Sequence, residues 1–150
     1  RVLTGAAFDS NAKDLSLANI KPRLRMTTLY FLAARRKLLV VGTGNKSEIM
    51  IGYSTKYGDG GVDLLPIGSL VKTEVREFAR FLGVPQEIID KAPSAGLWAG
   101  QTDEAEMGFT YEELDRYILT GDGSPETKAI IKSMIKRSEH KKMLPPVPQL

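Results

Sequence analysis

A run of small and polar residues from Gly42 to Glu48 connects a short apolar segment to a stretch with helical spacing. In an open α/β sheet, ligands bind at the carboxyl ends of strands, where helix amides and short polar side chains meet a nucleotide. We therefore expect Thr43 and Glu48 to face such a crevice. The alternative, an ordinary strand-to-helix turn with a solvated glutamate, is the more common origin of this spacing.

A second run, from Thr55 to Asp63, places charged and aromatic side chains among glycines. Glycine lets the backbone come close to a ligand. Lys56 is suited to meet a phosphate or a carboxylate, and Asp63 is suited to accept a hydrogen bond from a ribose or an amide. A glycine-rich surface turn without a ligand explains the composition equally well.

Taken in order, four motifs resemble the NAD synthetase family: Gly42 to Glu48, Lys56 to Gly61, residues 64–67 and residues 139–141. The glycine-rich second motif is closer to the ammonia-dependent branch than to the glutamine-dependent enzymes. The resemblance implies an α/β fold of the Rossmann-like adenine nucleotide alpha hydrolase (ATP pyrophosphatase) type, in which helices flank a parallel sheet. Residues 1–150 would form the carboxyl-terminal part of that single domain.

The resemblance also implies ligands for individual side chains. Glu48 becomes a ligand of the Mg²⁺ ion that bridges the ATP phosphates, since a hard cation prefers carboxylate oxygens. Ser94 stands where many family members have threonine, and it keeps the hydroxyl. Cationic side chains suit deamido-NAD, which carries a pyrophosphate and a carboxylate. The implied ATP contacts are Thr43, Lys72 and Ser94, and the implied deamido-NAD contacts are Arg23, Lys56, Asp63, His140 and Lys141.

The implied reaction is the ATP-dependent amidation of deamido-NAD by ammonia, the last step of NAD biosynthesis, which gives NAD, AMP and pyrophosphate through an adenylated intermediate. The family also implies a homodimer. Its Ser-Gly-Gly-x-Asp-Ser loop, which wraps the ATP pyrophosphate, does not occur in residues 1–150. Because the sequence starts at Arg1 and not at Met, we expect this loop to lie upstream, and the 150 residues alone to be inactive.

Composition limits the other possibilities. The net charge is +3 and the basic residues are interspersed with acids, which favours a few phosphate sites over a nucleic-acid surface. Without cysteine there are no disulfides or thiolate metal sites. No stretch approaches the roughly 18 consecutive apolar residues of a membrane span, so we expect a cytoplasmic protein that binds neither membranes nor nucleic acid.

Two other functions fit parts of the sequence. A related ATP pyrophosphatase that modifies RNA would use the basic segment 132–142 as its nucleic-acid surface. The motif from Lys56 to Gly61 argues against that function. The third possibility is a non-catalytic nucleotide-binding or dimerisation module. Considered without the family, Arg23, Lys72 and His140 would each be solvated side chains.

Hydrophobic periodicity predicts the elements that must position these residues. Residues 19–36 predict a helix of about four turns with Asn19 as its cap. The β-branched run 38–41 predicts a strand buried on both faces of a parallel sheet, with the remaining strands upstream. Residues 1–18 predict a loop, and residues 91–110 predict a long loop that closes over the site as a lid. Further helices are expected at 45–51, 71–82, 110–119 and 124–137, with a turn starting at Pro85.

Overall fold

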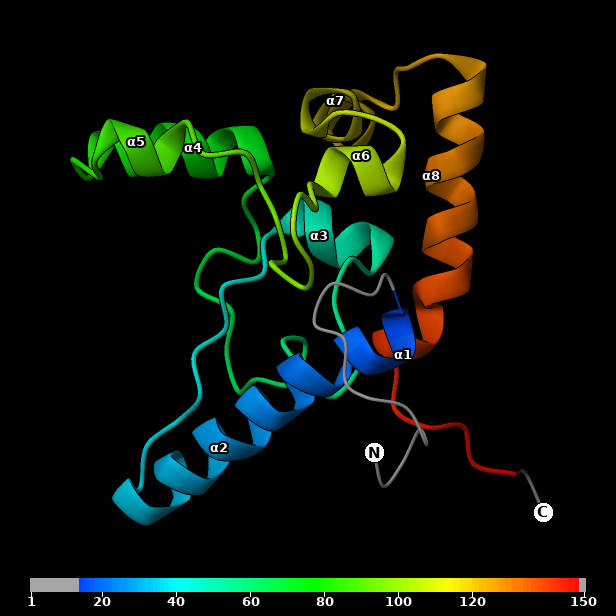
Figure 1. Ribbon diagram of the computed structural model, residues 1–150. Helices are drawn as coiled ribbons and strands as arrows, with labels where there is room; N and C mark the ends of the chain where they lie inside the picture. Colours follow the sequence, from blue (N-terminus) through cyan, green and yellow to red (C-terminus); the bar gives the residue numbers. More distant parts are fainter. Residues whose placement is uncertain (1–13, 149–150) are drawn as a thin grey trace.

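A computed structural model describes residues 14–148 of the chain (Figure 1). Within this range the chain forms eight α-helices and one short 3₁₀ helix, η1, connected by extended segments and turns. Their bounds are α1 Leu15–Ala18, α2 Ile20–Arg36, α3 Lys46–Ile51, α4 Lys72–Phe81, α5 Gln86–Ile89, α6 Asp103–Met107, α7 Tyr111–Thr120, α8 Pro125–Ser138 and η1 Glu139–Lys141.

The longer helices lie where the sequence predicts them, because local signals define their ends. The side chain of Thr110 accepts a hydrogen bond from Glu113 N at the start of α7, and Ser124 caps α8. Asn19 is the N-cap residue of α2, as predicted, but its side chain makes no capping hydrogen bond. Its Oδ1 atom instead accepts a hydrogen bond from Thr55 Oγ1 at 2.6 Å, which fastens the start of α2 to a distant turn.

The predicted strand at 38–41 is reduced to a single parallel bridge between Val41 and Leu64. Two hydrogen bonds form this bridge, from Gly42 N to Leu64 O at 2.8 Å and from Asp63 N to Val40 O at 2.9 Å. Only Val40 of the run is buried. A strand buried on both faces needs neighbours along both edges and layers on both sides, and the described residues supply one neighbouring segment.

Two short helices occupy segments that the sequence predicts as loops. Within 1–18, residues 1–13 lie outside the described residues, and α1 follows Asp14, which caps it. Within 91–110, α6 begins after Thr102, which caps it, and its last residue, Met107, is buried in the core. Helices of four or five residues carry little periodicity of their own, so tertiary contacts decide whether they form.

The core lies where α3, α6, α7 and α8 meet, on one side of the molecule (Figure 1). Its buried residues include Ile51 from α3, Leu114 from α7 and Ile131 from α8. The pair α4–α5 projects from this body as an arm, and α2 extends in another direction (Figure 1). The helix predicted at 71–82 forms as α4, but its apolar side chains are only partly covered, since no residue of α4 is buried.

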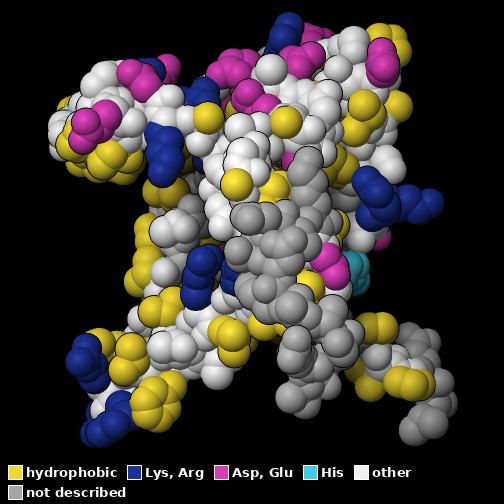
Figure 2. All heavy atoms as spheres, in the orientation of Figure 1, with side chains coloured by type: hydrophobic (Ala, Val, Ile, Leu, Met, Phe, Trp, Pro, Cys, Tyr) yellow, Lys and Arg dark blue, Asp and Glu magenta, His cyan; other side chains and the backbone are white. Residues whose placement is uncertain are grey.

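Exposed hydrophobic side chains gather on the arm and along α2 (Figure 2). Phe81 on the arm is 83% exposed, and Leu24 and Phe31 on α2 are 63% and 58% exposed. Among the helices in residues 14–148, none combines the length and the apolar character that crossing a membrane requires.

Candidate functional site

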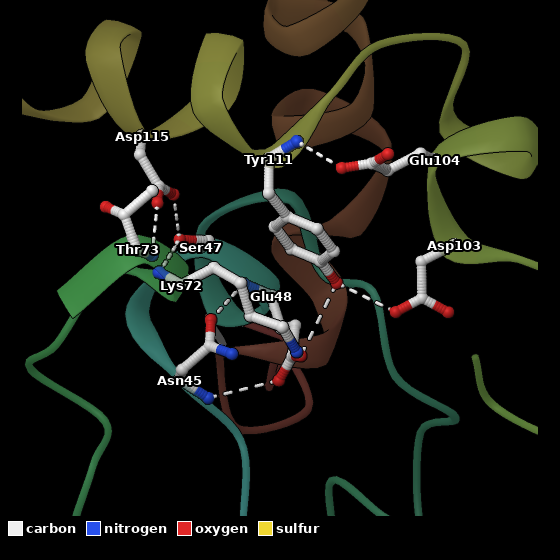
Figure 3. A network of polar contacts seen from close by, with 9 residues as sticks. All are labelled: Asn45, Ser47, Glu48, Lys72, Thr73, Asp103, Glu104, Tyr111 and Asp115. Carbon is white, nitrogen blue, oxygen red and sulfur yellow. Dashed lines mark hydrogen bonds and ion pairs between the residues drawn. The ribbon is translucent and has the colours of Figure 1, made fainter. Parts of the chain in front are cut away.

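Glu48 lies at the start of α3, where three groups converge on its carboxylate (Figure 3). Its Oε2 atom accepts a hydrogen bond from Asn45 N at 3.1 Å, and this bond forms one half of a capping box. Its Oε1 atom forms an ion pair with Lys72 Nζ at 2.9 Å. The hydroxyl of Tyr111 lies 3.4 Å from the same oxygen. The glutamate is therefore fixed in position, with one oxygen directed at a cation.

The ammonium group of Lys72, the first residue of α4, lies against the face of an aromatic ring. Its Nζ atom lies 4.8 Å from the centroid of the Tyr111 ring, a distance at which the ring attracts the ammonium group. The Tyr111 hydroxyl donates a hydrogen bond to Asp103 Oδ2 at 2.9 Å. Burial, and then the carboxylates of Glu48 and Asp103, raise the pKa of Tyr111, so its hydroxyl stays protonated and acts as a donor.

Asp103, at the start of α6, supplies the second carboxylate of this cluster. The residue is buried, and its Oδ1 atom has no hydrogen-bond partner among the described residues. Burial raises the pKa of this carboxyl group, against the opposing effects of the Tyr111 hydrogen bond and the Lys72 charge. The cluster therefore contains an acceptor atom that a ligand or a small cation could satisfy.

Glu48, Lys72 and Asp103 line a hollow of about 470 Å³ between the α4–α5 arm and the segment 91–95, here called the first hollow. The structure thus brings together three predicted residues, Glu48, Lys72 and Ser94. The Ser94 hydroxyl accepts a hydrogen bond from Gly96 N at 3.1 Å. Thr43 is exposed and does not line the first hollow.

Three of the residues predicted to bind deamido-NAD form a second group. Lys56 Nζ lies 3.4 Å from His140 Nδ1, and Arg23 Nε donates a hydrogen bond to the Lys56 carbonyl at 3.3 Å. Residues 23, 56 and 140 are far apart in sequence, so the fold gathers three basic side chains in one place. Such a group suits an anionic ligand.

Lys141 lies beside this group but turns inward. Its Nζ atom donates hydrogen bonds to the carbonyls of Gly52 at 2.7 Å and Ser54 at 2.6 Å. Burial lowers the pKa of Lys141, and the charge of Asp59 opposes this effect. Lys141 therefore fastens the C-terminal segment to the turn after α3, and it also lines a second hollow of about 370 Å³.

Asp63 has both carboxylate oxygens engaged within the fold. Oδ2 accepts from Val40 N at 2.7 Å, and Oδ1 accepts from the Tyr30 hydroxyl at 3.1 Å. The side chain therefore holds α2 and the segment before Val41 against the bridge. A carboxylate has about four acceptor sites, so these two bonds leave capacity for a ligand.

The two hollows adjoin, because Tyr53, Asp59 and Ala95 line both. Three residues near these hollows were not predicted from the sequence to have a role: Tyr53, Asp103 and Tyr111. Asp103 belongs to a family-like polar cluster, 101–104, but nothing in its spacing connects it with residue 48. Tyr111 directly follows a capping threonine, and its burial depends on packing that periodicity does not predict.

The described residues contain no group of three or more His, Cys, Asp or Glu side chains that could hold a metal ion by themselves. Mg²⁺ commonly uses only one or two protein carboxylates and takes its other ligands from substrate phosphates and water. Glu48 and Asp103 line the same hollow, and two carboxylates fit that pattern.

Comparison with known proteins identifies the class to which this fold and site belong. The model of the family described as NAD synthase matches residues 1–145, so the chain belongs to the NAD synthase family. The resemblance in the sequence motifs is confirmed. The fold is that of the adenine nucleotide alpha hydrolases, as predicted.

Two similar relatives are both described as NH(3)-dependent NAD(+) synthetases. The chain is 67% identical over 138 residues to the NH(3)-dependent NAD(+) synthetase of Carboxydothermus hydrogenoformans, covering 92% of this chain and 57% of that relative. It is 61% identical to the corresponding protein of Syntrophomonas wolfei, covering 86% of this chain and 52% of that relative. The chain spans just over half the length of these curated relatives.

Solved structures agree in fold. An NMN synthetase from Francisella tularensis matches with a TM-score of 0.88 and 43% identity, over 94% of this chain and 59% of that one. An NH3-dependent NAD synthetase from Campylobacter jejuni matches with a TM-score of 0.69 and 33% identity, over 94% of this chain and 58% of that one.

Proposed function

We propose that the protein catalyses the ATP-dependent amidation of deamido-NAD by ammonia, giving NAD, AMP and pyrophosphate. The observation that carries this proposal is the Lys72–Glu48 pair at the wall of the first hollow, in a chain 67% identical to an NH(3)-dependent NAD(+) synthetase. A cation and a carboxylate side by side suit a phosphate chain that carries its own divalent ion.

The reaction follows two displacements. The nicotinate carboxylate attacks the α-phosphorus of ATP and pyrophosphate leaves, and ammonia then attacks the acyl carbon and AMP leaves. Mg²⁺ would supply charge neutralisation at the phosphates, with Glu48 as its ligand. The Lys72 ammonium stabilises negative charge that develops on the leaving group, and the hydroxyl of Ser94 orients ATP in the first hollow. Thr43 would contact a part of ATP that lies outside this hollow.

The basic group around Lys56 binds the second substrate. Lys56 lies in contact with both Arg23 and His140, and Lys141 lines the second hollow. Together they would hold the pyrophosphate of deamido-NAD, while Asp63 accepts a further hydrogen bond from the dinucleotide. Because the two hollows adjoin, the proposal places the acceptor carboxylate near the α-phosphorus. The enzyme works as a cytoplasmic homodimer without a nucleic-acid partner.

A second candidate is the synthesis of NMN, from its carboxylic acid counterpart. It is favoured by the TM-score of 0.88 to the Francisella tularensis NMN synthetase. Both candidates amidate a nicotinate ring, so they share the chemistry of the first hollow. The two acceptors differ in one part: deamido-NAD carries an adenylate half, joined through its pyrophosphate, and the mononucleotide does not. The basic group around Lys56 would bind that pyrophosphate.

The test measures product formation by the natural polypeptide with ATP, Mg²⁺ and either deamido-NAD or nicotinic acid mononucleotide, each with ammonia or glutamine. We expect NAD from deamido-NAD with ammonia alone, and none after chelation of Mg²⁺. The variant Lys72→Met should reduce kcat/KM by about 100-fold, because it removes charge stabilisation from the transition state.

Lys132→Met is the matched control, since Lys132 is exposed on α8 and outside both hollows. It should keep full activity. Preferred use of the mononucleotide would establish the second candidate. No product from any combination, with ATP still bound, would point to an RNA-modifying or non-catalytic protein.

A further inference from the structure

The first turn of α4 is capped by side chains from two other helices. Its N-cap residue, Val71, has no polar side chain to satisfy the free amides of the turn. Lys72 N instead donates to Ser47 Oγ on α3 at 3.0 Å, and Thr73 N donates to Asp115 Oδ2 on α7 at 2.7 Å. These acceptors lie 25 and 42 residues away in sequence. The start of α4 is therefore set by α3 and α7 (Figure 3).

Asp115 connects the two caps. Its Oδ1 atom accepts the Ser47 hydroxyl hydrogen, which leaves the serine oxygen free to accept from Lys72 N. Asp115 is 2% exposed and Ser47 is fully buried, so water cannot replace either bond. The carboxylate also lies at the positive end of the α4 dipole, where a negative charge is favourable.

These bonds fix the geometry of the Lys72–Glu48 pair. Glu48 follows Ser47 directly on α3, and Lys72 is itself held by the Ser47 hydroxyl. Holding the two backbones together places Lys72 Nζ at 2.9 Å from Glu48 Oε1. Tyr111 lies one turn before Asp115 on the same face of α7 and contacts both side chains of the pair.

We propose that Asp115 is a positioning residue for the amidation reaction: through Ser47 and the first amides of α4, it sets Lys72 against Glu48 at the wall of the first hollow. This inference rests on the proposed function, in which Lys72 stabilises the leaving group. Asp115 itself lines neither hollow, so its effect on the reaction acts through other residues. A purely structural role would affect stability without affecting the catalytic rate of the folded enzyme.

The variant Asp115→Asn keeps the shape of the side chain but offers one acceptor oxygen where Ser47 and Thr73 require two. One donor loses its partner, and the start of α4 shifts. With saturating substrates, kcat should fall by about 10- to 100-fold, because a displacement of the order of 1 Å has that effect on a positioned group. The KM for ATP should change much less, by no more than about threefold.

Two further variants separate positioning from stability. Glu113→Gln removes a capping carboxylate from the same helix, but Glu113 caps Thr110 and lines neither hollow. It should lower the free energy of unfolding and leave kcat unchanged. Ser47→Ala breaks the same connection without altering Asp115, so its effect on kcat should be non-additive with that of Asp115→Asn.

A second readout does not depend on activity. The rate of chemical acylation of the Lys72 amino group, followed by mass spectrometry, reports how well Glu48 holds it. This rate should rise by about threefold or more in Asp115→Asn and stay constant in Glu113→Gln. A folded Asp115→Asn protein with unchanged kcat and unchanged Lys72 acylation would overturn the proposal. Absence of product from the parent, with increased acylation in the variant, would overturn the proposed function alone.

Discussion

At the scale of single residues, Asp103 combines burial with an unpartnered oxygen. Burial raises its pKa from the ordinary value of 3.8, so the folded protein binds this proton more tightly than the unfolded chain does. The unfolded chain thus releases its proton first as the pH rises. The free energy of unfolding therefore decreases as the pH rises from 3.8 to the pKa of Asp103 in the folded protein. Above that pKa, the folded protein carries the full cost of burying the charged carboxylate.

Asp103→Asn should therefore raise the free energy of unfolding at pH 7 by about 1 kcal/mol, since it removes the buried charge and keeps an acceptor for the Tyr111 hydroxyl. It should also flatten the dependence of stability on pH above 3.8, where the carboxyl group of the unfolded chain ionises. Urea unfolding at several pH values measures both effects. Asp122→Asn, at an exposed position, is the control and should change neither. A variant less stable than the parent at pH 7 would contradict this account.

The motifs predicted some residues of the site and could not predict others. Glu48, Lys72 and Ser94 were predicted from a resemblance, and they line one hollow. Thr43 does not join them in the described residues. Tyr111 and Asp115 were not predicted, because their roles depend on where α7 packs against α3 and α4. That packing is a property of the tertiary fold and leaves no pattern in the local sequence.

At the scale of elements, the contact between α3 and α8 depends on Gly52. This residue ends α3 with φ +65°, a left-handed conformation that glycine adopts at little cost. A Cβ atom at this position would lie 2.1 Å from the Cβ of Ser138 in α8. The backbones therefore approach as closely as they do because residue 52 has no side chain.

Gly52→Ala should reduce the free energy of unfolding by about 3 kcal/mol or more, because α8 must move away in addition to the strain at positive φ. Gly121→Ala is the matched control. Gly121 also ends a helix, with φ +76°, but a Cβ there meets nothing within 4 Å. It should cost about 1 kcal/mol, the strain alone. Equal losses in urea unfolding would show that the α3–α8 contact tolerates a side chain.

Elements with strong local signals were predicted, and elements defined by their neighbours were not. Capping residues and periodicity located α2, α3, α4, α7 and α8. The helix α6 forms because Met107 and Phe109 enter the core, which the sequence of 91–110 does not reveal. Residues 38–41 have the composition of a buried strand, but pairing with Leu64 alone forms a single bridge. The conformation of a strand depends on its neighbours more than that of a helix does.

At the scale of the whole molecule, the exposed hydrophobic side chains of α2 predict that another protein surface packs against this helix. Ile20, Leu24 and Phe31 are exposed, and their spacing places them on one face of the helix. Exposed apolar side chains grouped in this way mark an interaction surface. The proposed homodimer supplies an occupant for it, a second copy of the same helix.

Leu24→Glu tests this surface in the natural polypeptide. A charge in the centre of a closely packed contact is poorly solvated, so the dissociation constant of the dimer should rise by about tenfold or more. Leu119→Glu is the control, because Leu119 is similarly exposed but lies on α7. Sedimentation velocity over a range of concentrations distinguishes the two variants. Leu24→Glu could instead lower stability and leave the dissociation constant of the dimer unchanged. This result would contradict the prediction and would show that another part of the same polypeptide covers this face of α2, because the loss of an intramolecular contact does not depend on protein concentration.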